Sequence, residues 1–240
     1  MGNRILALTA TALMICAAGA SRAEPVHRVI ELFTSQGCSS CPPADRLAAK
    51  LASEPGTVLI SLPVTYWDYL GWKDSFASPA FTERQKAYSK ARGDMQVYTP
   101  QAVVNGVAHA VGSEPDSIDD AAKEGSRPAV SIAETVSGEE LNIDVAAGTS
   151  GEGAQVWLIP VLSSANVAIG RGENAGAKVT YINIARGLKK LGDWDGAARN
   201  FAVSTADIRD TGADSAAVFL QAQKDGLPGA ILGASIVKLK

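Results

Sequence analysis

Residues 31–45 read ELFTSQGCSSCPPAD, and this stretch decides the predicted fold. The β-branched and aromatic run at residues 29–33 predicts a short strand. After a polar turn come Cys38 and Cys41, and the alanines and leucines of residues 44–52 then recur at helical spacing. We therefore expect the two cysteines to lie where a strand ends and a helix begins.

The first half of the chain continues to alternate between strands and helices. Residues 57–64 form an apolar run that is typical of a buried strand. Ser78 and Pro79 supply an N-cap hydroxyl and a proline for the first helical position, which predicts a helix that ends near Lys90. Beyond this helix, Asn105-Gly106 accepts the positive φ angles of a tight hairpin turn. We expect the hairpin strands at residues 101–104 and 107–110, and a last helix at residues 113–124.

The second half of the chain has a different character. From about Pro128 onward, short apolar runs are separated by glycine-rich or charged turns. Regular spacing of this kind is typical of an all-β sandwich, or of a sheet that packs on a first domain. We expect a domain boundary after Arg127. The predicted strands lie at residues 129–136, 141–146, 155–162, 179–185, 217–223 and 231–238.

Four segments resemble a known family: residues 31–45, residues 66–74 (YWDYLGWKD), residues 98–101 (YTPQ) and residues 171–176 (RGENAG). In these segments the chain is similar to the exported thioredoxin-like family labelled "domain of unknown function 1223". The resemblance implies an α/β thioredoxin-like domain over residues 24–127, followed by a smaller all-β, sandwich-like domain over residues 128–240. The family label itself implies no reaction.

Residues 1–23 have the layout of a secretory signal peptide. Arg4 precedes an apolar stretch at residues 5–20, and Ser21-Arg22-Ala23 fits a small-residue cleavage site. The apolar stretch is shorter than the roughly 20 residues that a membrane-spanning helix needs. We therefore expect a periplasmic or secreted protein that keeps no membrane anchor after cleavage.

Cys38 and Cys41 are the only cysteines outside the predicted signal peptide. At a helix N-terminus, free amide groups and the helix dipole stabilise a thiolate and lower the pKa of a cysteine to about 3.5–7.5. We expect Cys38 to be the accessible nucleophile and Cys41 to be the resolving thiol that attacks the mixed disulfide. A purely structural disulfide is the alternative, but so short a loop gains only about 2 kcal/mol in the chain-entropy formula.

The predicted function is therefore that of an exported thiol-disulfide oxidoreductase. It would act on the thiols or disulfides of exported proteins or peptides, and a redox partner protein would restore it. Two alternatives stay open: the pair could bind a soft metal ion such as Cu(I), or the protein could be a non-catalytic interaction module. Ser39 and Ser40 between the cysteines do not reveal the direction of the redox reaction.

The resemblance implies further site residues. Thioredoxin-like proteins place a cis-proline opposite the cysteine pair, and the backbone of the preceding residue pairs with an incoming peptide. Pro100 directly precedes the predicted hairpin, where that proline belongs, so Thr99 and Pro100 are candidate substrate-binding residues. Glu31 is a candidate for the buried acid that assists proton transfer to the resolving cysteine, and a solvated strand carboxylate is the alternative.

The aromatic block at residues 66–74 lies between Cys41 and Pro100 in the sequence. It could line a groove beside the cysteines, or it could fill the core. Because polar residues interleave with the aromatic ones, the block does not form one buried face, and we favour the groove. Trp67 and Trp72 are therefore candidate substrate-binding residues.

Composition and spacing disfavour several other functions. The net charge of −3 over 240 residues argues against nucleic acid and anionic membranes as partners. His27 and His109 lie far from the cysteines and show no finger-like spacing, so no zinc site is expected. The glycine-rich residues 170–176 are not followed by a helical pattern, so we expect a turn that touches the first domain and no cofactor.

Overall fold

The protein is described by a computed structural model that covers residues 25–149, 151 and 153–239. The predicted signal peptide therefore lies outside the described residues. In chain order the elements are β1 (Arg28–Thr34), α1 (Pro42–Ala52), β2 (Thr57–Pro63), the 3-10 helix η1 (Asp68–Leu70), α2 (Pro79–Arg92), β3 (Gln101–Val104), β4 (Ala108–Val111), α3 (Pro115–Ala121), β5 (Ile132–Ser137), β6 (Glu140–Val145), β7 (Ala154–Ala168), β8 (Lys178–Ala185), β9 (Lys189–Trp194), β10 (Arg199–Ser204), α4 (Thr205–Arg209), β11 (Ser215–Lys224) and β12 (Leu227–Lys238).

Local sequence signals account for the elements of the N-terminal half. The N-cap Ser78 accepts a hydrogen bond from the Ala80 amide at 3.3 Å and starts α2. Asn105 and Gly106 adopt φ angles of 50° and 74° and join β3 to β4. A side chain at position 106 would lie 2.4 Å from the carbonyl oxygen of Gly229, so this turn needs glycine. The helices, strands and hairpin predicted for this half are confirmed.

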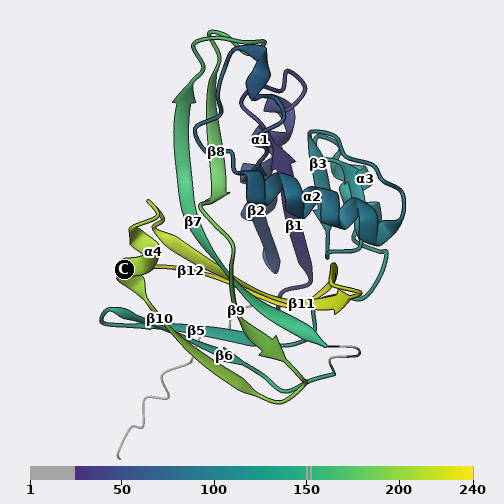
Figure 1. The fold of residues 1–240 in the computed structure, drawn as a ribbon, viewed down its shortest axis with the longest axis vertical. Coiled ribbons are helices and arrows are strands. Elements are labelled where there is room, and N and C mark those ends of the chain that lie inside the picture. Colours follow the sequence, from purple (N-terminus) through teal and green to yellow (C-terminus); the bar gives the residue numbers. More distant parts are fainter. Residues whose placement is uncertain (1–24, 150, 152, 240) are drawn as a thin grey trace, which may run out of the picture.

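Two sheets form the scaffold (Figure 1). The larger sheet has nine strands in the order β12-β11-β7-β8-β2-β1-β3-β4, with β9 paired to β7. Within it, β1 and β2 are parallel, whereas β3 is antiparallel to both β1 and β4. The smaller antiparallel sheet has the order β10-β6-β5.

Helices α1 and α2 cover opposite faces of β1. Leu51 of α1 packs in one core cluster with Leu32, whereas Tyr88 of α2 packs in another cluster with Phe33. Successive residues of β1 therefore face the two helices in turn, as the period of two in a strand requires. The turn after β1 leads directly into α1, which places the cysteines at the carboxyl end of β1.

The predicted fold class is wrong. The structure is mostly β, with 43% strand and 19% helix, and one mixed sheet runs through both halves of the chain. The join is made by β8, which lies parallel to β2 and pairs Ile184 with Ser61. The sheet crosses the expected boundary after Arg127, so no separate β domain follows a thioredoxin-like one. Alternating hydrophobicity predicts that a strand exists, but it does not reveal which strand will be its neighbour.

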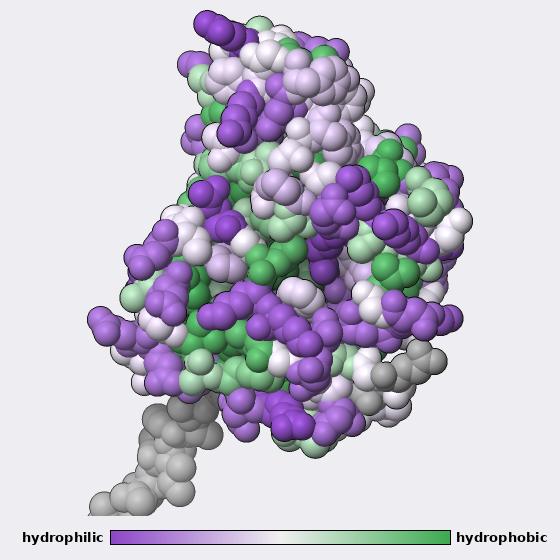
Figure 2. Space-filling view, viewed as in Figure 1, coloured by the Kyte–Doolittle hydropathy of each residue, from purple (hydrophilic) through white to green (hydrophobic). Residues whose placement is uncertain are grey.

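The long strand β7 makes this continuous sheet geometrically feasible. It pairs with β9 through residues 154–158 and with β8 through residues 161–168, while β11 lies along residues 154–161. Figure 2 shows a largely polar face, with apolar patches in its lower half near β12 and the smaller sheet. Within the described ranges, no helix has the length and apolar character that crossing a membrane requires.

Candidate functional site

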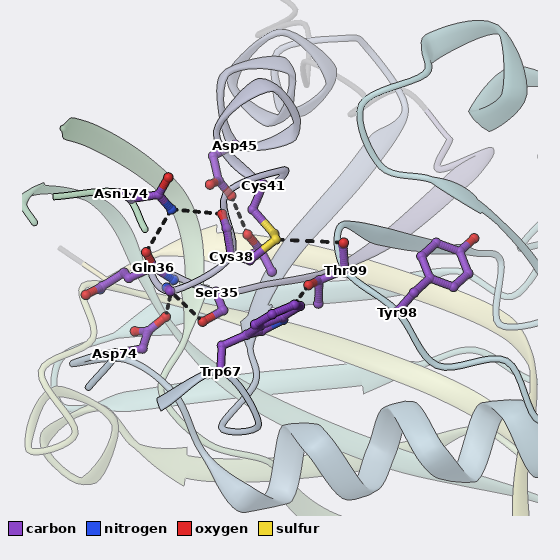
Figure 3. The surroundings of a disulfide bond; sticks show 12 residues. Ser35, Gln36, Cys38, Cys41, Asp45, Trp67, Asp74, Tyr98, Thr99 and Asn174 are labelled. Carbon is purple, nitrogen blue, oxygen red and sulfur yellow. Dashed lines mark hydrogen bonds between the residues drawn. A yellow bond between two sulfur atoms is a disulfide. The ribbon is translucent and has the colours of Figure 1, made fainter. Parts of the chain in front are cut away.

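Cys38 and Cys41 form a disulfide in the turn between β1 and α1 (Figure 3). Their Cα atoms are 5.4 Å apart, and Cys41 is the N-cap residue of α1. Ser39 and Ser40 between them are exposed. The predicted position of the pair, at a strand-to-helix junction, is confirmed, and Pro42 and Pro43 remove two amide donors from the first turn of α1.

The structure does not show Cys38 as an accessible residue. Its exposed fraction is 1% and that of Cys41 is 0%. The Sγ atom of Cys38 lies 3.7 Å from the carbonyl oxygen of Thr99, which comes from the loop before β3. A partner that attacks the disulfide must therefore displace part of this loop or wait until it moves.

Thr99 and Pro100 lie beside the cysteines, as predicted, and the peptide bond between them is cis. The Thr99 hydroxyl oxygen accepts a hydrogen bond from the indole Nε1 of Trp67 at 2.7 Å. The Thr99 carbonyl oxygen faces Cys38, and a thiol formed there by reduction could donate a hydrogen bond to it.

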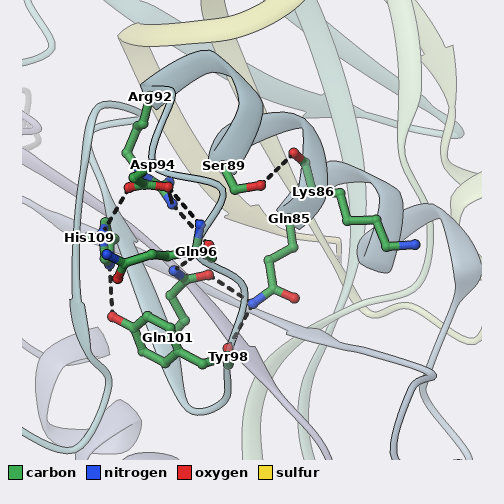
Figure 4. Close-up of polar contacts among 9 residues, drawn as sticks. All are labelled: Gln85, Lys86, Ser89, Arg92, Asp94, Gln96, Tyr98, Gln101 and His109. Atoms are coloured by element: carbon green, nitrogen blue, oxygen red, sulfur yellow. Dashed lines mark hydrogen bonds and ion pairs between the residues drawn. The ribbon is translucent and has the colours of Figure 1, made fainter.

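A polar network holds the segment that carries Thr99 (Figure 4). Gln85 of α2 donates to the Tyr98 carbonyl oxygen and to Gln101 Oε1, both at 2.8 Å. The Tyr98 hydroxyl lies 2.8 Å from Nδ1 of His109, and Nε2 of His109 lies 3.2 Å from a carboxylate oxygen of Asp94. Burial lowers the pKa of His109, and the nearby Arg92 lowers it further. The backbone next to Cys38 is therefore positioned by α2 and β4.

The aromatic block packs on the loop that precedes Cys38. Trp72 donates a hydrogen bond to Gln36 Oε1 at 2.8 Å, and Asp74 accepts one from the Gln36 amide at 2.8 Å. A Cβ atom at Gly37 would lie 3.1 Å from Trp67, which shows how closely the block approaches the loop. Both tryptophans thus lie at the candidate site: Trp67 holds Thr99, and Trp72 holds the loop that precedes Cys38.

Asn174 in the loop between β7 and β8 joins the site from the C-terminal half. Its Nδ2 donates hydrogen bonds to the carbonyl oxygens of Gln36 at 3.0 Å and Cys38 at 2.8 Å. The expectation that the glycine-rich residues 170–176 touch the first half of the chain is therefore confirmed. The specific role of Asn174 was missed, because nothing in the local sequence indicates which backbone it reaches.

Glu31 does not lie near the resolving cysteine. It is fully buried and forms an ion pair with Arg84 of α2, with Nη2 of Arg84 at 3.0 Å from Oε2. The hydroxyl of Tyr88 donates to the same oxygen. Its neighbour Leu32 faces α1, so Glu31 points to the opposite side of the sheet, away from Cys41. The predicted catalytic role requires Glu31 to lie on the face of the sheet that α1 covers, and the structure places it on the opposite face.

Asp45 is a buried acid next to the cysteines. It is 2% exposed and follows Cys41 by one helical turn, and its amide donates to the Cys41 carbonyl oxygen at 3.1 Å. The Thr34 hydroxyl donates to its Oδ1 at 2.7 Å, while its Oδ2 has no hydrogen-bond partner among the described residues. Figure 3 shows the Asp45 carboxylate directed toward the cysteine turn.

The electrostatics around Asp45 favour its protonated form. Burial raises its pKa to about 7, the Thr34 hydrogen bond opposes this shift, and the charge of Asp74 adds to it. Burial also raises the pKa of Asp74 and of Tyr181, and both acids contribute to the shift at Tyr181. The sequence does contain a signal for Asp45, which occupies the same helix face as the buried Ala48.

No metal site of several ligands accompanies the cysteines. Among the described residues, no group of three or more His, Cys, Asp and Glu side chains could hold a metal ion. His109 bonds to Tyr98 and Asp94, as described above. Any ion at the site would therefore depend on the two sulfur atoms after reduction.

The fold and the site define a mostly β protein with a buried Cys-x-x-Cys disulfide at the N-terminus of a helix. The chain belongs to the family described as protein of unknown function DUF1223, whose sequence profile matches residues 29–221. This part of the predicted resemblance is confirmed. None of the curated proteins matches the chain significantly in sequence.

Two solved structures are similar to the protein. The crystal structure of protein AGR_C_4864 from Agrobacterium tumefaciens is 36% identical, with a TM-score of 0.81, and the match covers 90% of this chain and 95% of that one. HBP35 of Porphyromonas gingivalis is 12% identical, with a TM-score of 0.61, and the match covers 90% of this chain and 76% of that one. The second likeness concerns the fold alone.

Proposed function

We propose that the protein is an exported thiol-disulfide oxidoreductase that acts on protein or peptide thiols through Cys38 and Cys41. The observation that carries this proposal is the disulfide at the start of α1, with the Thr99 carbonyl oxygen 3.7 Å from Cys38 Sγ. Helix N-termini stabilise thiolates, and a thiolate is the form of cysteine that exchanges disulfides. Hydrogen bonds from Trp72 and Asn174 and to Asp74 fix the conformation of the turn that carries the cysteines.

The exchange can be written for a reduced protein and a substrate disulfide. The Cys38 thiolate attacks one substrate sulfur, forms a mixed disulfide and releases the other substrate sulfur as a thiolate, which takes up a proton. Cys41 then loses its proton and attacks Cys38 Sγ, which restores the protein disulfide and releases the second substrate thiol. The substrate gains two electrons and the cysteine pair loses two. Oxidation of a substrate follows the same steps in reverse.

Asp45 is suited to accept the proton of Cys41 in this scheme. Residues four apart on a helix are neighbours, with Cβ atoms about 5–6 Å apart. The carboxylate oxygen Oδ2 has no hydrogen-bond partner within the described part of the chain, and a pKa of about 7 lets the group take up and release protons near neutral pH. Partners of the protein would be exported thiol proteins and a second redox protein that returns the cysteines to their starting state.

The proposal is tested by the exchange of purified protein with a fluorescent peptide disulfide. We expect the reduced wild type to reduce the peptide and Cys38→Ser to show no detectable exchange, because the variant lacks the nucleophile. A parallel competitive titration with Cu(I) separates the alternative. Tight Cu(I) binding without any exchange in the wild type would replace the oxidoreductase by a metal-binding module.

Asp45→Asn is expected to remove one pH dependence of the free energy of unfolding. Burial raises the pKa of Asp45 from 3.8 to about 7, so between these values the folded protein keeps a proton that the unfolded chain has lost. The free energy of unfolding of the wild type is therefore highest below about pH 4. It falls by up to about 4 kcal/mol as the pH rises to about 7. Urea unfolding of the oxidised protein at pH 4 to 8 should show the variant equal at pH 4 and more stable at pH 8.

The same variant should change the exchange reaction. In the wild type, the resolving step should accelerate as the pH rises through about 7, and in Asp45→Asn this inflection should vanish, with a rate about 10- to 100-fold lower at pH 8. Asp116→Asn on the exposed face of α3 is a matched control, expected to leave both profiles unchanged. An unaltered pH profile in a folded Asp45→Asn protein would exclude Asp45 as the proton acceptor.

A further inference from the structure

A cleft of about 690 Å³ opens between β12 and β5. Its walls come from residues 25–26, 56–58, 128–134 and 234–237. Thr57 in this wall pairs with Arg28 at one end of β1, whereas the cysteines follow the other end of that strand. The cleft is therefore separate from the disulfide site, and its volume lies within the range of about 300–1,000 Å³ that is usual for small-molecule sites.

Glu134 stands among apolar residues on the wall formed by β5. Burial alternates along this strand, and Ile132 and Val136 pack against the core between the two sheets. Glu134 lies midway between them and so shares their inward face. An acid in the middle of an otherwise apolar inward face is unusual for a strand whose only task is to pack.

Two buried polar atoms in the cleft lack a well-formed hydrogen bond. Among the described residues, Oε1 of Glu134 and Oγ of Ser235 make no hydrogen bond of normal geometry, although the two side chains interact with each other. Burial raises the pKa of Glu134 to about 8, although the nearby Ser235 opposes the shift. None of the residues that line the cleft is Lys, Arg or His. Because a buried carboxyl whose only polar neighbour is a hydroxyl destabilises a protein, the packing of the fold does not explain Glu134.

We propose that this cleft binds a small organic amine with an apolar body. The ammonium group would donate hydrogen bonds to Glu134 Oε1 and Ser235 Oγ, and it would neutralise the carboxylate without help from the protein. The apolar body would pack on Val26, Val58 and Ile132, which line the same cleft. An anion would be repelled by Glu134, and a neutral apolar molecule would leave both polar atoms unpaired.

The probe is 2-phenylethylamine, with 2-phenylethanol as its uncharged counterpart. Titrations of the purified protein at about pH 8, followed by NMR, should show the amine binding about 10- to 100-fold more tightly than the alcohol, since charge-assisted hydrogen bonds have this effect. In Glu134→Gln the affinity for the amine should fall to that for the alcohol. Ser235→Ala should lower the affinity for the amine by a smaller factor, and it provides a second variant if Glu134→Gln is poorly folded.

Thermal unfolding distinguishes a binding residue from a structural one. At pH 8 without ligand, we expect Glu134→Gln to melt at a higher temperature than the wild type, because it removes a carboxyl that is costly to ionise in the cleft. A lower melting temperature, equal affinities for amine and alcohol, or no binding of the amine at millimolar concentration would each overturn the proposal. None of these outcomes depends on exchange by the cysteines, so the two proposals are tested independently.

Discussion

Cys41→Ser is expected to accumulate as mixed disulfides with exported thiol proteins, whereas Cys38→Ser should capture none. In the proposed order of steps, Cys38 forms the mixed disulfide and Cys41 releases it. Removal of Cys41 therefore stops the reaction after capture, and removal of Cys38 stops it before capture. Non-reducing gels and mass spectrometry of each variant would show the difference as covalent adducts that disappear with reductant.

The burial of the pair makes this experiment stringent. Cys38 is 1% exposed in the disulfide form, and the Thr99 carbonyl oxygen lies beside its sulfur. A surface thiol captures many proteins without selection, but a buried one reacts only with partners that can open the Thr99 segment. The double variant Cys38→Ser/Cys41→Ser is the control for adducts that do not involve the pair. Equal capture by both single variants, or by neither, would contradict an exchange reaction with these roles.

Arg84→Met is expected to lower the free energy of unfolding by about 3–5 kcal/mol, the largest stability effect that we predict. The substitution leaves Glu31 fully buried without its cationic partner, and removal of one member of a buried ion pair has a cost of this size. Tyr88 would remain as a donor to Glu31, but a single neutral hydroxyl cannot balance the charge. Urea unfolding with an unchanged m-value would measure the loss.

Two control variants isolate the cause. Lys86→Met removes an exposed partner of Glu83 on the same helix and should change stability by about 0.5 kcal/mol or less. The double variant Glu31→Leu/Arg84→Met removes both charges and should recover most of the loss, because no buried charge is left unpaired. A loss below about 1 kcal/mol in Arg84→Met would contradict a stabilising role for the ion pair between Arg84 and Glu31.

The local elements and the cysteine junction could be predicted because their signals lie within a few residues. The N-cap at Ser78, the turn at Asn105-Gly106 and the helix after Cys41 each depend on neighbouring residues and on backbone preferences. The family resemblance implies a proline beside the cysteines, and the position before the hairpin identifies it as Pro100. These features would hold for many arrangements of the strands around them.

The sheet that joins both halves could not be predicted in the same way. The pairing of β2 with β8 brings Ser61 and Ile184 together across a large part of the chain, and no local pattern marks it. The prediction of the fold class fails at this pairing, because the sequence pattern predicts a separate unit for the strands after Arg127. Which strands pair is decided by the total burial that the whole chain achieves, a sum over many distant contacts.

The residues of the candidate site also fall into two groups, those that the local sequence predicts and those that only tertiary contacts bring together. The sequence alone predicts that Cys38 and Cys41 lie at the start of a helix. The two cysteines are close in the chain, and the helical spacing of the residues after them indicates α1. Only the tertiary structure decided that Glu31 faces Arg84 and that Asn174 reaches the cysteine turn from the other half of the chain. It also decided that Cys38 is buried. The exposure of a residue depends on which distant segments pack against it, and those segments come together only in the folded protein.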